Sequence, residues 1–369
     1  MRSGARAIVS LLTALIVIGA SGPARALYDG ADEEEIGREN DKAIVAQYGL
    51  VADPDLQQYV TTVGKRVLRH ILDPEFDYQF KVIDADMVNA FALPGGYIYV
   101  TRGLLAAVNS EAELANILGH EIGHVVGHHS VKQMKKSLGS LLLTLGVLAA
   151  SEDARQNAGA WVAVSQSLSQ QIISGYGREN EMESDRIGMI AAYDAGYDPA
   201  GMSRFLHSLR RMERQKAIGY HGFMASHPDT VSRIIEADQA SSLLKTREKK
   251  AEDFRDRYLE AIAGLPYGKV EGPGGRPPYT IQLRTVAAGE SWRSLTAFAS
   301  GDEGLAIETA ALNGADVNDP LTSGMVVKTI VPVRSKTLEL HEEKSGEIGP
   351  RTGDGKGGQN GGADPMPHP

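Results

Sequence analysis

One short motif constrains this chain more than any other feature: two histidines lie four residues apart in His120-Glu121-x-x-His124, within an apolar helical pattern. At 100° per residue, they lie about 40° apart on one helix face, one turn from each other. Both imidazoles can therefore reach one metal ion. Glu121 can hold a metal-bound water and accept its proton as the water attacks a carbonyl. The alternative is a hydrogen-bonded histidine pair on an ordinary helix.

A zinc ion bound in this way needs a third protein ligand and an open position for water. No third histidine follows His124 at the spacing of the metzincin pattern. Acids lie instead at alternate positions of a later segment, at Glu179, Glu181, Glu183 and Asp185. Glu181 and Asp185 share a helix face, whereas Glu183 points nearly opposite. A solvated charged face has the same pattern, so these residues alone leave both interpretations open.

Two further histidines, His128 and His129, continue the same helical pattern. His128 lies four residues after His124, so a second metal ion is one interpretation of the cluster. We favour the simpler interpretation, in which His128 leaves the metal face and lies at the end of the helix.

The N-terminus has the pattern of a secretory signal peptide. Arg2 and Arg6 precede an apolar stretch over residues 7–19, and a small-x-small site ends at Ala26. The stretch is short for a membrane span, and an uncleaved anchor is the alternative. The chain has no cysteine, which excludes disulfides and thiolate metal sites and fits export to a bacterial periplasm. We therefore predict a periplasmic protein, cleaved near Ala26.

Composition and patterning narrow the partners and the fold class. The 369 residues include 38 Lys or Arg and 47 Asp or Glu, and the formal charge of −9 argues against a nucleic-acid partner. Strand patterns cover residues 78–83 and 97–101. Helical patterns cover residues 30–71, 110–126, 160–175, 178–195, 200–216 and 229–262. We therefore expect a mainly α fold with a small β-sheet, in which the apolar run 137–150 forms a buried or interfacial helix.

Changes in composition divide the chain further. Residues 264–279 are rich in Gly and Pro, and we interpret them as a linker between a domain at 27–263 and a small module at 280–334. Residues 335–369 are again rich in Gly and Pro, which predicts a disordered tail. The signal peptide at 1–26 completes this division.

Taken together, the motifs resemble the zinc metallopeptidases of the HtpX and CAAX prenyl protease family, and within it the periplasmic, BepA-type branch. The shared motifs are H-E-x-x-H, Glu181-x-x-x-Asp185-x-x-Gly188, Ala195–Pro199, Ser226-His227-Pro228 with Arg233-Ile234, and Asn89–Gly96. The resemblance covers residues from about 30 to 240. It implies a gluzincin-type α+β metallopeptidase domain over residues 27–263.

The resemblance also implies roles for individual residues. It implies one zinc ion per chain, held by His120, His124 and Glu181, with Glu121 as general base and Asp185 as an acid or as a partner of a ligand. In the periplasmic branch the histidine of the His-Pro motif can approach the zinc. This implies His227 as a fourth ligand or switch, and leaves open whether it inhibits or assists. Arg178 and Arg186 are candidate partners of an oxyanion or carboxylate, with salt bridges to neighbouring acids as the simpler interpretation.

Residues 280–334 resemble a LysM module: a strand, a turn at Gly289-Glu290-Ser291 into a helix, Leu312-Asn313, and a final strand after Gly324. Glu290 stands where such modules usually have Asp, and the spacing is loose. The resemblance implies a separate small α+β module with peptidoglycan as a ligand. A stabilising module without affinity for glycan is the alternative.

These observations favour a zinc metalloendopeptidase of the cell envelope. We expect it to hydrolyse peptide bonds of unfolded or misassembled proteins, outer-membrane proteins among them, through a metal-activated water. One alternative is a chaperone-like assembly factor with a closed site, and another is a peptidoglycan-associated hydrolase. The Glu121→Gln substitution separates the protease from the chaperone-like factor, because only a protease would lose its function.

Overall fold

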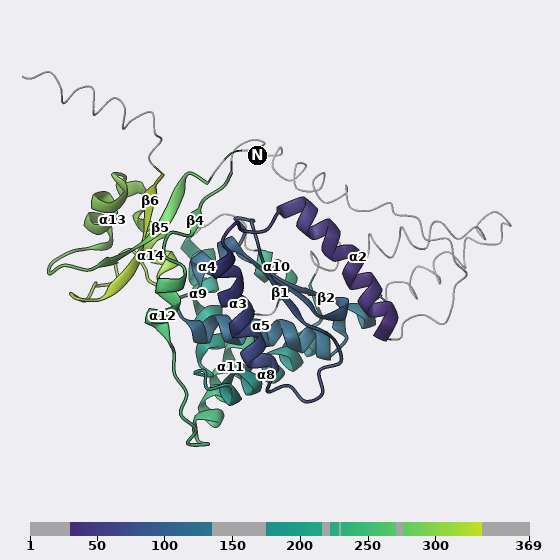
Figure 1. Ribbon diagram of the computed structural model, residues 1–369. Helices are drawn as coiled ribbons and strands as arrows, with labels where there is room; N and C mark the ends of the chain where they lie inside the picture. Colours follow the sequence, from purple (N-terminus) through teal and green to yellow (C-terminus); the bar gives the residue numbers. More distant parts are fainter. Residues whose placement is uncertain are drawn as a thin grey trace, which may run out of the picture. The chain divides into compact units, whose positions relative to one another are not determined.

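The computed structural model describes residues 30–134, 175–215, 222–228, 230–270, 275 and 277–333. Most of these residues lie in helices, and two small sheets accompany them (Figure 1). This confirms the predicted mainly α fold with a small β-sheet. The described residues up to Pro332 belong to one compact unit.

The first sheet contains β1 (Gln79–Ile83), β2 (Ala90–Leu93) and β3 (Tyr97–Thr101) in the order β1-β3-β2. β1 runs parallel to β3, and β2 runs antiparallel to it. The short 3-10 helix η1 (Pro94–Gly96) joins β2 to β3. Gly95 has a φ of 75°, and an added Cβ would lie 2.8 Å from the backbone of Glu34, so the turn requires glycine.

Alternation along β3 sends its side chains to two different cores. Ile98 and Val100 belong to the main core, which includes residues of α3 (Pro54–Leu68) and α5 (Glu111–Val126). Tyr99 faces the opposite side, where α2 (Gly30–Tyr48) covers the sheet. There its hydroxyl donates to Asp41 of α2 over 2.6 Å. The sheet is therefore buried on both faces.

Helices α5 and α8 (Arg178–Asp194) pack unusually closely, and glycines make this possible. A Cβ added to Gly119 would lie 2.8 Å from the backbone of Gly188, and one added to Gly188 would lie 2.5 Å from Gly119 and His120. Further along the same contact, a Cβ on Gly123 would lie 2.8 Å from Ser184. Two backbones this close bring the side chains of one helix directly above those of the other.

The remaining helices of this region are short or interrupted. They are α4 (Arg102–Ala107), α9 (Gly201–Gln215), α10 (Gly222–Ser226), α11 (Thr230–Lys245) and α12 (Arg255–Ala261). The continuous helical region predicted over 229–262 is wrong in its middle part, because residues 246–254 are not helical. Their backbone groups form hydrogen bonds with distant segments. The N–H of Glu252 donates to the carbonyl of Gly196, and the carbonyl of Asp253 accepts from the N–H of Ala112. These tertiary bonds replace the helical ones.

The second sheet contains β4 (Pro266–Tyr267), β5 (Tyr279–Thr285) and β6 (Val326–Pro332), all antiparallel. Between β5 and β6 lie α13 (Trp292–Ser300), η3 (Glu303–Leu305) and α14 (Ala306–Leu312). Lys328 of β6 is fully buried, and its Nζ donates to the carbonyls of Ala106 and Val108, 2.7 Å away in each case. The division into a domain, a linker and a LysM-like module stays a prediction.

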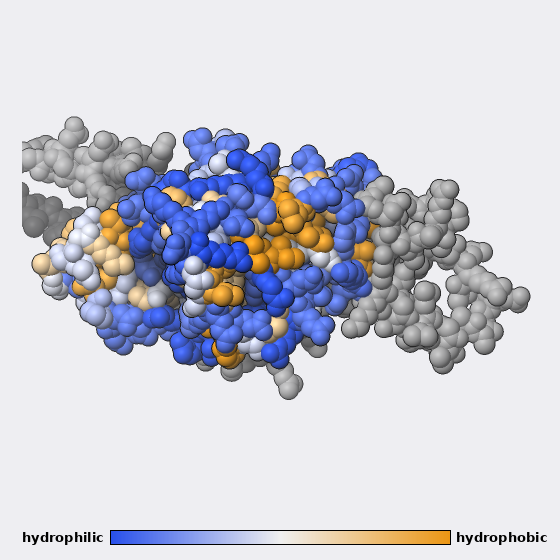
Figure 2. Space-filling model, turned by 90° about the horizontal axis from the view of Figure 1, so that it is seen from below, coloured by the Kyte–Doolittle hydropathy of each residue, from blue (hydrophilic) through white to orange (hydrophobic). Residues whose placement is uncertain are grey.

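Several predicted segments lie outside the described residues: the signal peptide, the apolar run 137–150, nearly all of the helix at 160–175, and the tail at 335–369. Among the described helices, none is long and apolar enough to cross a membrane. Seen from below the view of Figure 1, the surface is largely hydrophilic, with apolar patches between (Figure 2).

Candidate metal centre

Four buried side chains point their ligand atoms at one another. His120 and His124 come from α5, Glu181 from α8, and His227 from the turn after α10. One ligand atom of each lies within 4.8 Å of the others. The Nε2 atoms of His120 and His124 are 2.9 Å apart, and His227 Nδ1 lies 3.1 Å from both His120 Nε2 and Glu181 Oε1. These four residues could therefore hold a single metal ion.

The close packing of α5 on α8 brings Glu181 to the two histidines. His227 is held separately. Its backbone N–H donates to the carbonyl of Phe223 over 2.7 Å, and the hydroxyl of the preceding Ser226 donates to Asn89 Oδ1 over 3.1 Å. The Asn89–Gly96 segment therefore supports the turn that carries His227.

Asp185 lies behind His120 and faces away from the other ligands. Its Oδ1 is 2.7 Å from His120 Nδ1. A carboxylate at Nδ1 keeps the hydrogen on that nitrogen and leaves the Nε2 lone pair free for a metal ion. In this geometry Asp185 can orient the ring of His120.

A buried arginine, Arg233 of α11, joins the acids of the site. Its Nε and Nη2 donate to the two oxygens of Asp185 over 2.7 and 2.8 Å, and its Nη1 lies 2.7 Å from Glu181 Oε2. Sequence reasoning missed this role and considered Arg178 and Arg186 instead. Arg186 is mostly exposed and lies 4.0 Å from Glu236. The only signal for Arg233 was its place after the His-Pro motif.

Burial and these ion pairs set the pKa values of the site. Burial alone would raise the pKa of Asp185, but Arg233 and His120 outweigh burial and bring this pKa to about 2. Burial would likewise raise the pKa of Glu181, which His227 and Arg233 hold well below its usual value. Burial lowers the pKa of His124 well below its usual value. These shifts favour the ionised forms of Asp185 and Glu181 and the neutral form of His124, the forms that bind a metal ion.

Glu121 lies inside the site, and its side chain makes no hydrogen bond within the described residues. Both carboxylate oxygens of Glu121 are buried. The Nε2 atom of His227 also lacks a hydrogen bond in the described part of the chain, and it lies 3.4 Å from Glu121 Oε1. Unpaired buried polar atoms are costly unless a ligand or water meets them. Burial also raises the pKa of Glu121. Histidine nitrogens, a carboxylate and an unpaired glutamate beside them fit a zinc ion with a water molecule.

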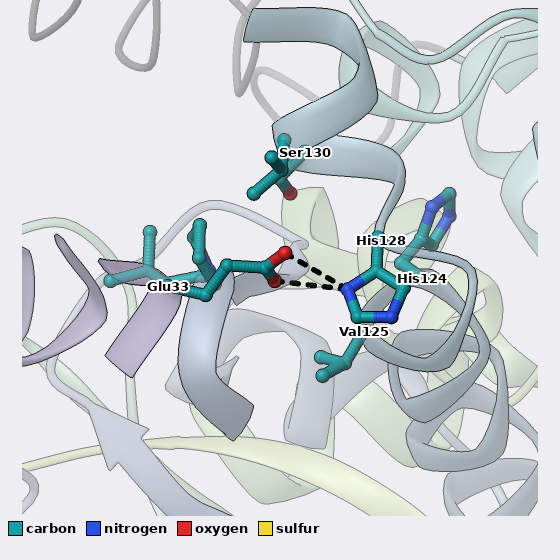
Figure 3. Close-up of a pocket in the computed structure, with 8 residues that line it drawn as sticks. Glu33, His124, Val125, His128 and Ser130 are labelled. Carbon is teal, nitrogen blue, oxygen red and sulfur yellow. Dashed lines mark hydrogen bonds and ion pairs between the residues drawn. The ribbon is translucent and has the colours of Figure 1, made fainter. Parts of the chain in front are cut away.

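The two additional histidines face in different directions. His128 lies at the end of the helix and pairs through Nδ1 with Glu33 of α2, 3.0 Å away, as Figure 3 shows. Its Nε2 lies 3.3 Å from Glu75, so it does not reach the four ligand atoms. This agrees with the simpler interpretation of His128. His129, in contrast, is buried and points to His124, with the two Nδ1 atoms 3.0 Å apart.

The comparisons with known proteins agree with this geometry. The model of Peptidase family M48 matches residues 54–241, half of the chain. The chain belongs to peptidase family M48. The matched region contains every site residue predicted from the sequence: His120, Glu121, His124, Glu181, Asp185 and His227. Membership in family M48 confirms the predicted resemblance to a metallopeptidase family.

Relatives of this chain include bacterial proteases and mitochondrial metalloendopeptidases. The chain is 31% identical over 207 residues to the beta-barrel assembly-enhancing protease of Yersinia pestis, covering 53% of this chain and 41% of that protein. The Escherichia coli protein of the same name is 30% identical over 211 residues, with 56% and 43% covered. The mitochondrial metalloendopeptidase OMA1 of Bos taurus is 31% identical over 206 residues, with 50% and 38% covered. The chain thus spans about two fifths of these relatives' lengths.

Proposed function

We propose that this protein is a zinc-dependent endopeptidase of the cell envelope that cuts unfolded or misassembled proteins. The observation that carries the proposal is the buried carboxylate of Glu121, which makes no hydrogen bond in the described part of the chain, beside three buried ligands within the M48 region. His120, His124 and Glu181 would hold the metal ion. When bound, zinc polarises a carbonyl and lowers the pKa of a water molecule to about 7.

The protein's own groups would perform the proton transfers. Glu121 accepts the proton of the attacking water and passes it to the leaving amine. Its burial raises its pKa, which suits a group that must bind a proton and then release it. Asp185, held by Arg233, keeps His120 in the tautomer that binds metal.

The substrate and the location follow from the relatives and the N-terminus. Two relatives carry the name beta-barrel assembly-enhancing protease, and residues 1–26 have the pattern of a signal peptide. These observations support the periplasm as the location and unfolded outer-membrane proteins as substrates. A chaperone-like assembly factor with a closed site is the alternative.

The Glu121→Gln variant tests the proposal. It should retain its zinc, because Glu121 is not a ligand. Its rate of casein hydrolysis should fall by about 10²–10⁴-fold, the contribution of a general base. His128→Gln is a matched control on the same helix, and it should retain activity because His128 faces Glu33. If Glu121→Gln still cleaved casein at the wild-type rate, the protease proposal would be wrong. If the wild-type protein cleaved no casein, and both wild type and Glu121→Gln suppressed the aggregation of an unfolded protein, the chaperone-like alternative would hold.

A second proposal concerns residues 280–334 as a ligand-binding module. Their order of strand, two helices and strand, with β5 antiparallel to β6, supports the predicted likeness to a LysM module. We propose peptidoglycan as its ligand. The full chain should then sediment with insoluble peptidoglycan, and protein that remains in the supernatant would support a purely stabilising module. Digestion of muropeptides in place of casein would instead support the hydrolase alternative.

A further inference from the structure

His129 is a buried histidine that the proposed chemistry does not use. Its Nδ1 lies 3.0 Å from His124 Nδ1, and its Nε2 lies 3.3 Å from Glu183 Oε2. Ser184 Oγ lies 3.2 Å from the same Nδ1. The side chain of His129 is fully buried, whereas that of Glu183 is 53% exposed. A chain of contacts thus leads from the surface through His129 to a ligand histidine.

The positions of the hydrogen atoms along this chain follow from His124. Its Nε2 faces the cluster, 2.9 Å from His120 Nε2 and 3.4 Å from Glu181 Oε1. A metal ligand must offer a lone pair there, so the hydrogen of His124 lies on Nδ1. Two facing ring nitrogens can bond only if one of them accepts.

His129 Nδ1 must therefore accept, which places the hydrogen of His129 on Nε2. That nitrogen faces Glu183, and a carboxylate can only accept. The hydroxyl of Ser184 can also donate to His129 Nδ1, which is consistent with an accepting nitrogen. All three neighbours of the ring thus agree with one tautomer.

The surrounding backbone makes room for this histidine. An added Cβ at Gly127 would overlap His129 Nε2. Gly127 has a φ of −74°, which any residue can adopt, so space for the His129 ring explains the glycine. On its other side, His124 stacks on Tyr176 at 4.0 Å, and the Tyr176 hydroxyl bonds to Ser130 Oγ over 2.7 Å. The His124 ring is therefore fixed by one stacking contact and one hydrogen bond.

We propose that His129 is a positioning residue of the metal site, which accepts the Nδ1–H of His124 and holds its Nε2 toward the metal ion. It is the counterpart of Asp185, which performs this task for His120. The inference rests on the proposed metal site, and it does not depend on which substrate is cut. Removing such an outer partner typically weakens metal binding by about 10–100-fold.

Three variants of the full chain test the proposal. His129→Leu fills the space without an acceptor, whereas His129→Asn places an oxygen where Nδ1 lies. His128→Leu is the matched control, because the neighbouring His128 pairs with Glu33 outside the ligand cluster. The measurement is zinc affinity by competition with a chromophoric chelator. We expect an approximately 10–100-fold loss for His129→Leu, substantial recovery for His129→Asn, and no change for His128→Leu.

Two results would overturn the proposal. The first is a His129→Leu affinity within about threefold of wild type, below the effect of an outer partner. The second is a His129→Asn variant as weak as His129→Leu, since a purely space-filling role would not distinguish an acceptor. Failure of the protease proposal would give a different result: the Glu121→Gln variant would retain both its zinc and its casein cleavage.

A measurement on wild type keeps the test valid if the variants fold poorly. Zinc is diamagnetic, so long-range ¹H–¹⁵N correlation spectra of the zinc-loaded chain report which ring nitrogen carries hydrogen. We expect Nδ1–H for His124 and Nε2–H for His129. The reversed pair of tautomers would contradict the proposal.

Discussion

Two acids of α8 that are only two positions apart have opposite environments. Glu181 is fully buried and lies 2.7 Å from Arg233, whereas Glu183 is half exposed. Glu181→Ala should lose most of its zinc, because it removes a ligand. Glu183→Ala should retain most of it, because water can replace an exposed carboxylate beside His129. Metal analysis of the dialysed variants decides this, and metal loss confined to Glu183→Ala would show that the ligand assignment is wrong.

His227 offers its two ring nitrogens to different partners. Nδ1 lies 3.1 Å from Glu181, and Nε2 lies 3.4 Å from Glu121, the proposed base. If His227 occupies the position that the water needs, the resting enzyme inhibits itself until a substrate displaces the imidazole. His227→Ala should then retain most of its zinc through the other three ligands and show raised basal proteolysis, including self-cleavage.

The competing role for His227 is that of a hydrogen-bond donor to the developing oxyanion. Loss of such a donor typically lowers the rate by about 10²–10³-fold. Casein turnover by His227→Ala therefore separates the two roles, because they predict changes of opposite sign. A fall of that size with zinc retained would contradict the switch.

At the scale of elements, the packing of α5 on α8 depends on glycine. A Cβ at Gly188 would lie 2.5 Å from backbone atoms, which cannot move aside as a side chain can. Gly188→Ala should therefore push the helices apart, lower the free energy of unfolding by about 1–3 kcal/mol, and weaken zinc binding as Glu181 moves away.

The matched control for this helix is Gly177→Ala at its N-cap, where an added Cβ meets nothing within 4 Å. It should lower the free energy of unfolding by about 1 kcal/mol, because glycine is preferred to alanine at an N-cap, and leave zinc affinity unchanged. Urea unfolding and chelator competition measure both effects. Equal stability and equal zinc affinity of the two variants would show that the helices can separate without cost.

Local patterns predicted the elements that carry the site. The spacing of His120 and His124 required a helix, and the four-residue spacing of Glu181 and Asp185 placed them on one face of another. The predicted helical region 229–262 failed at residues 246–254, where backbone groups bond to distant segments. Periodicity describes a segment by itself and contains no information about such distant partners.

The same limit explains which residues of the site were missed. Arg233 contacts Asp185 and Glu181, and His129 contacts His124, but the local patterns that contain these two residues do not reveal the contacts. Even the family resemblance contributed Arg233 only as part of a motif, without a role. Only the three-dimensional packing shows that His120 and His124 each have a neighbour at Nδ1.

At the scale of the whole molecule, Lys328 connects the second sheet to the region of the metal site. Its amine bonds to the carbonyls of Ala106 and Val108, just before α5 begins. Arg102 similarly donates to the carbonyls of Pro266 and Gly268, 3.0 and 3.2 Å away. These contacts support the start of α5, the helix that carries both ligand histidines.

Burial of Lys328 should make the stability of this unit depend on pH. Burial, with a smaller contribution from Arg255, outweighs Glu113 and lowers the pKa of Lys328 to about 7. In the unfolded chain the pKa of a lysine is about 10.4. Between these values the unfolded chain binds more protons than the folded one, so stability rises with pH.

Lys328→Met should remove this dependence, because methionine has a similar length and no charge. From pH 7 to pH 10, wild type should gain stability relative to Lys328→Met by up to about 1.4 kcal/mol per pH unit, the value for one proton. Lys250→Met is the control: Lys250 is exposed, and its pKa is raised through Glu252, so it gains nothing in this range. Urea unfolding of the three proteins at several pH values measures the difference. Parallel curves of unfolding free energy against pH for wild type and Lys328→Met would mean that Lys328 keeps its charge in the folded state. The two carbonyls and Glu113 would then have to stabilise a buried ammonium group.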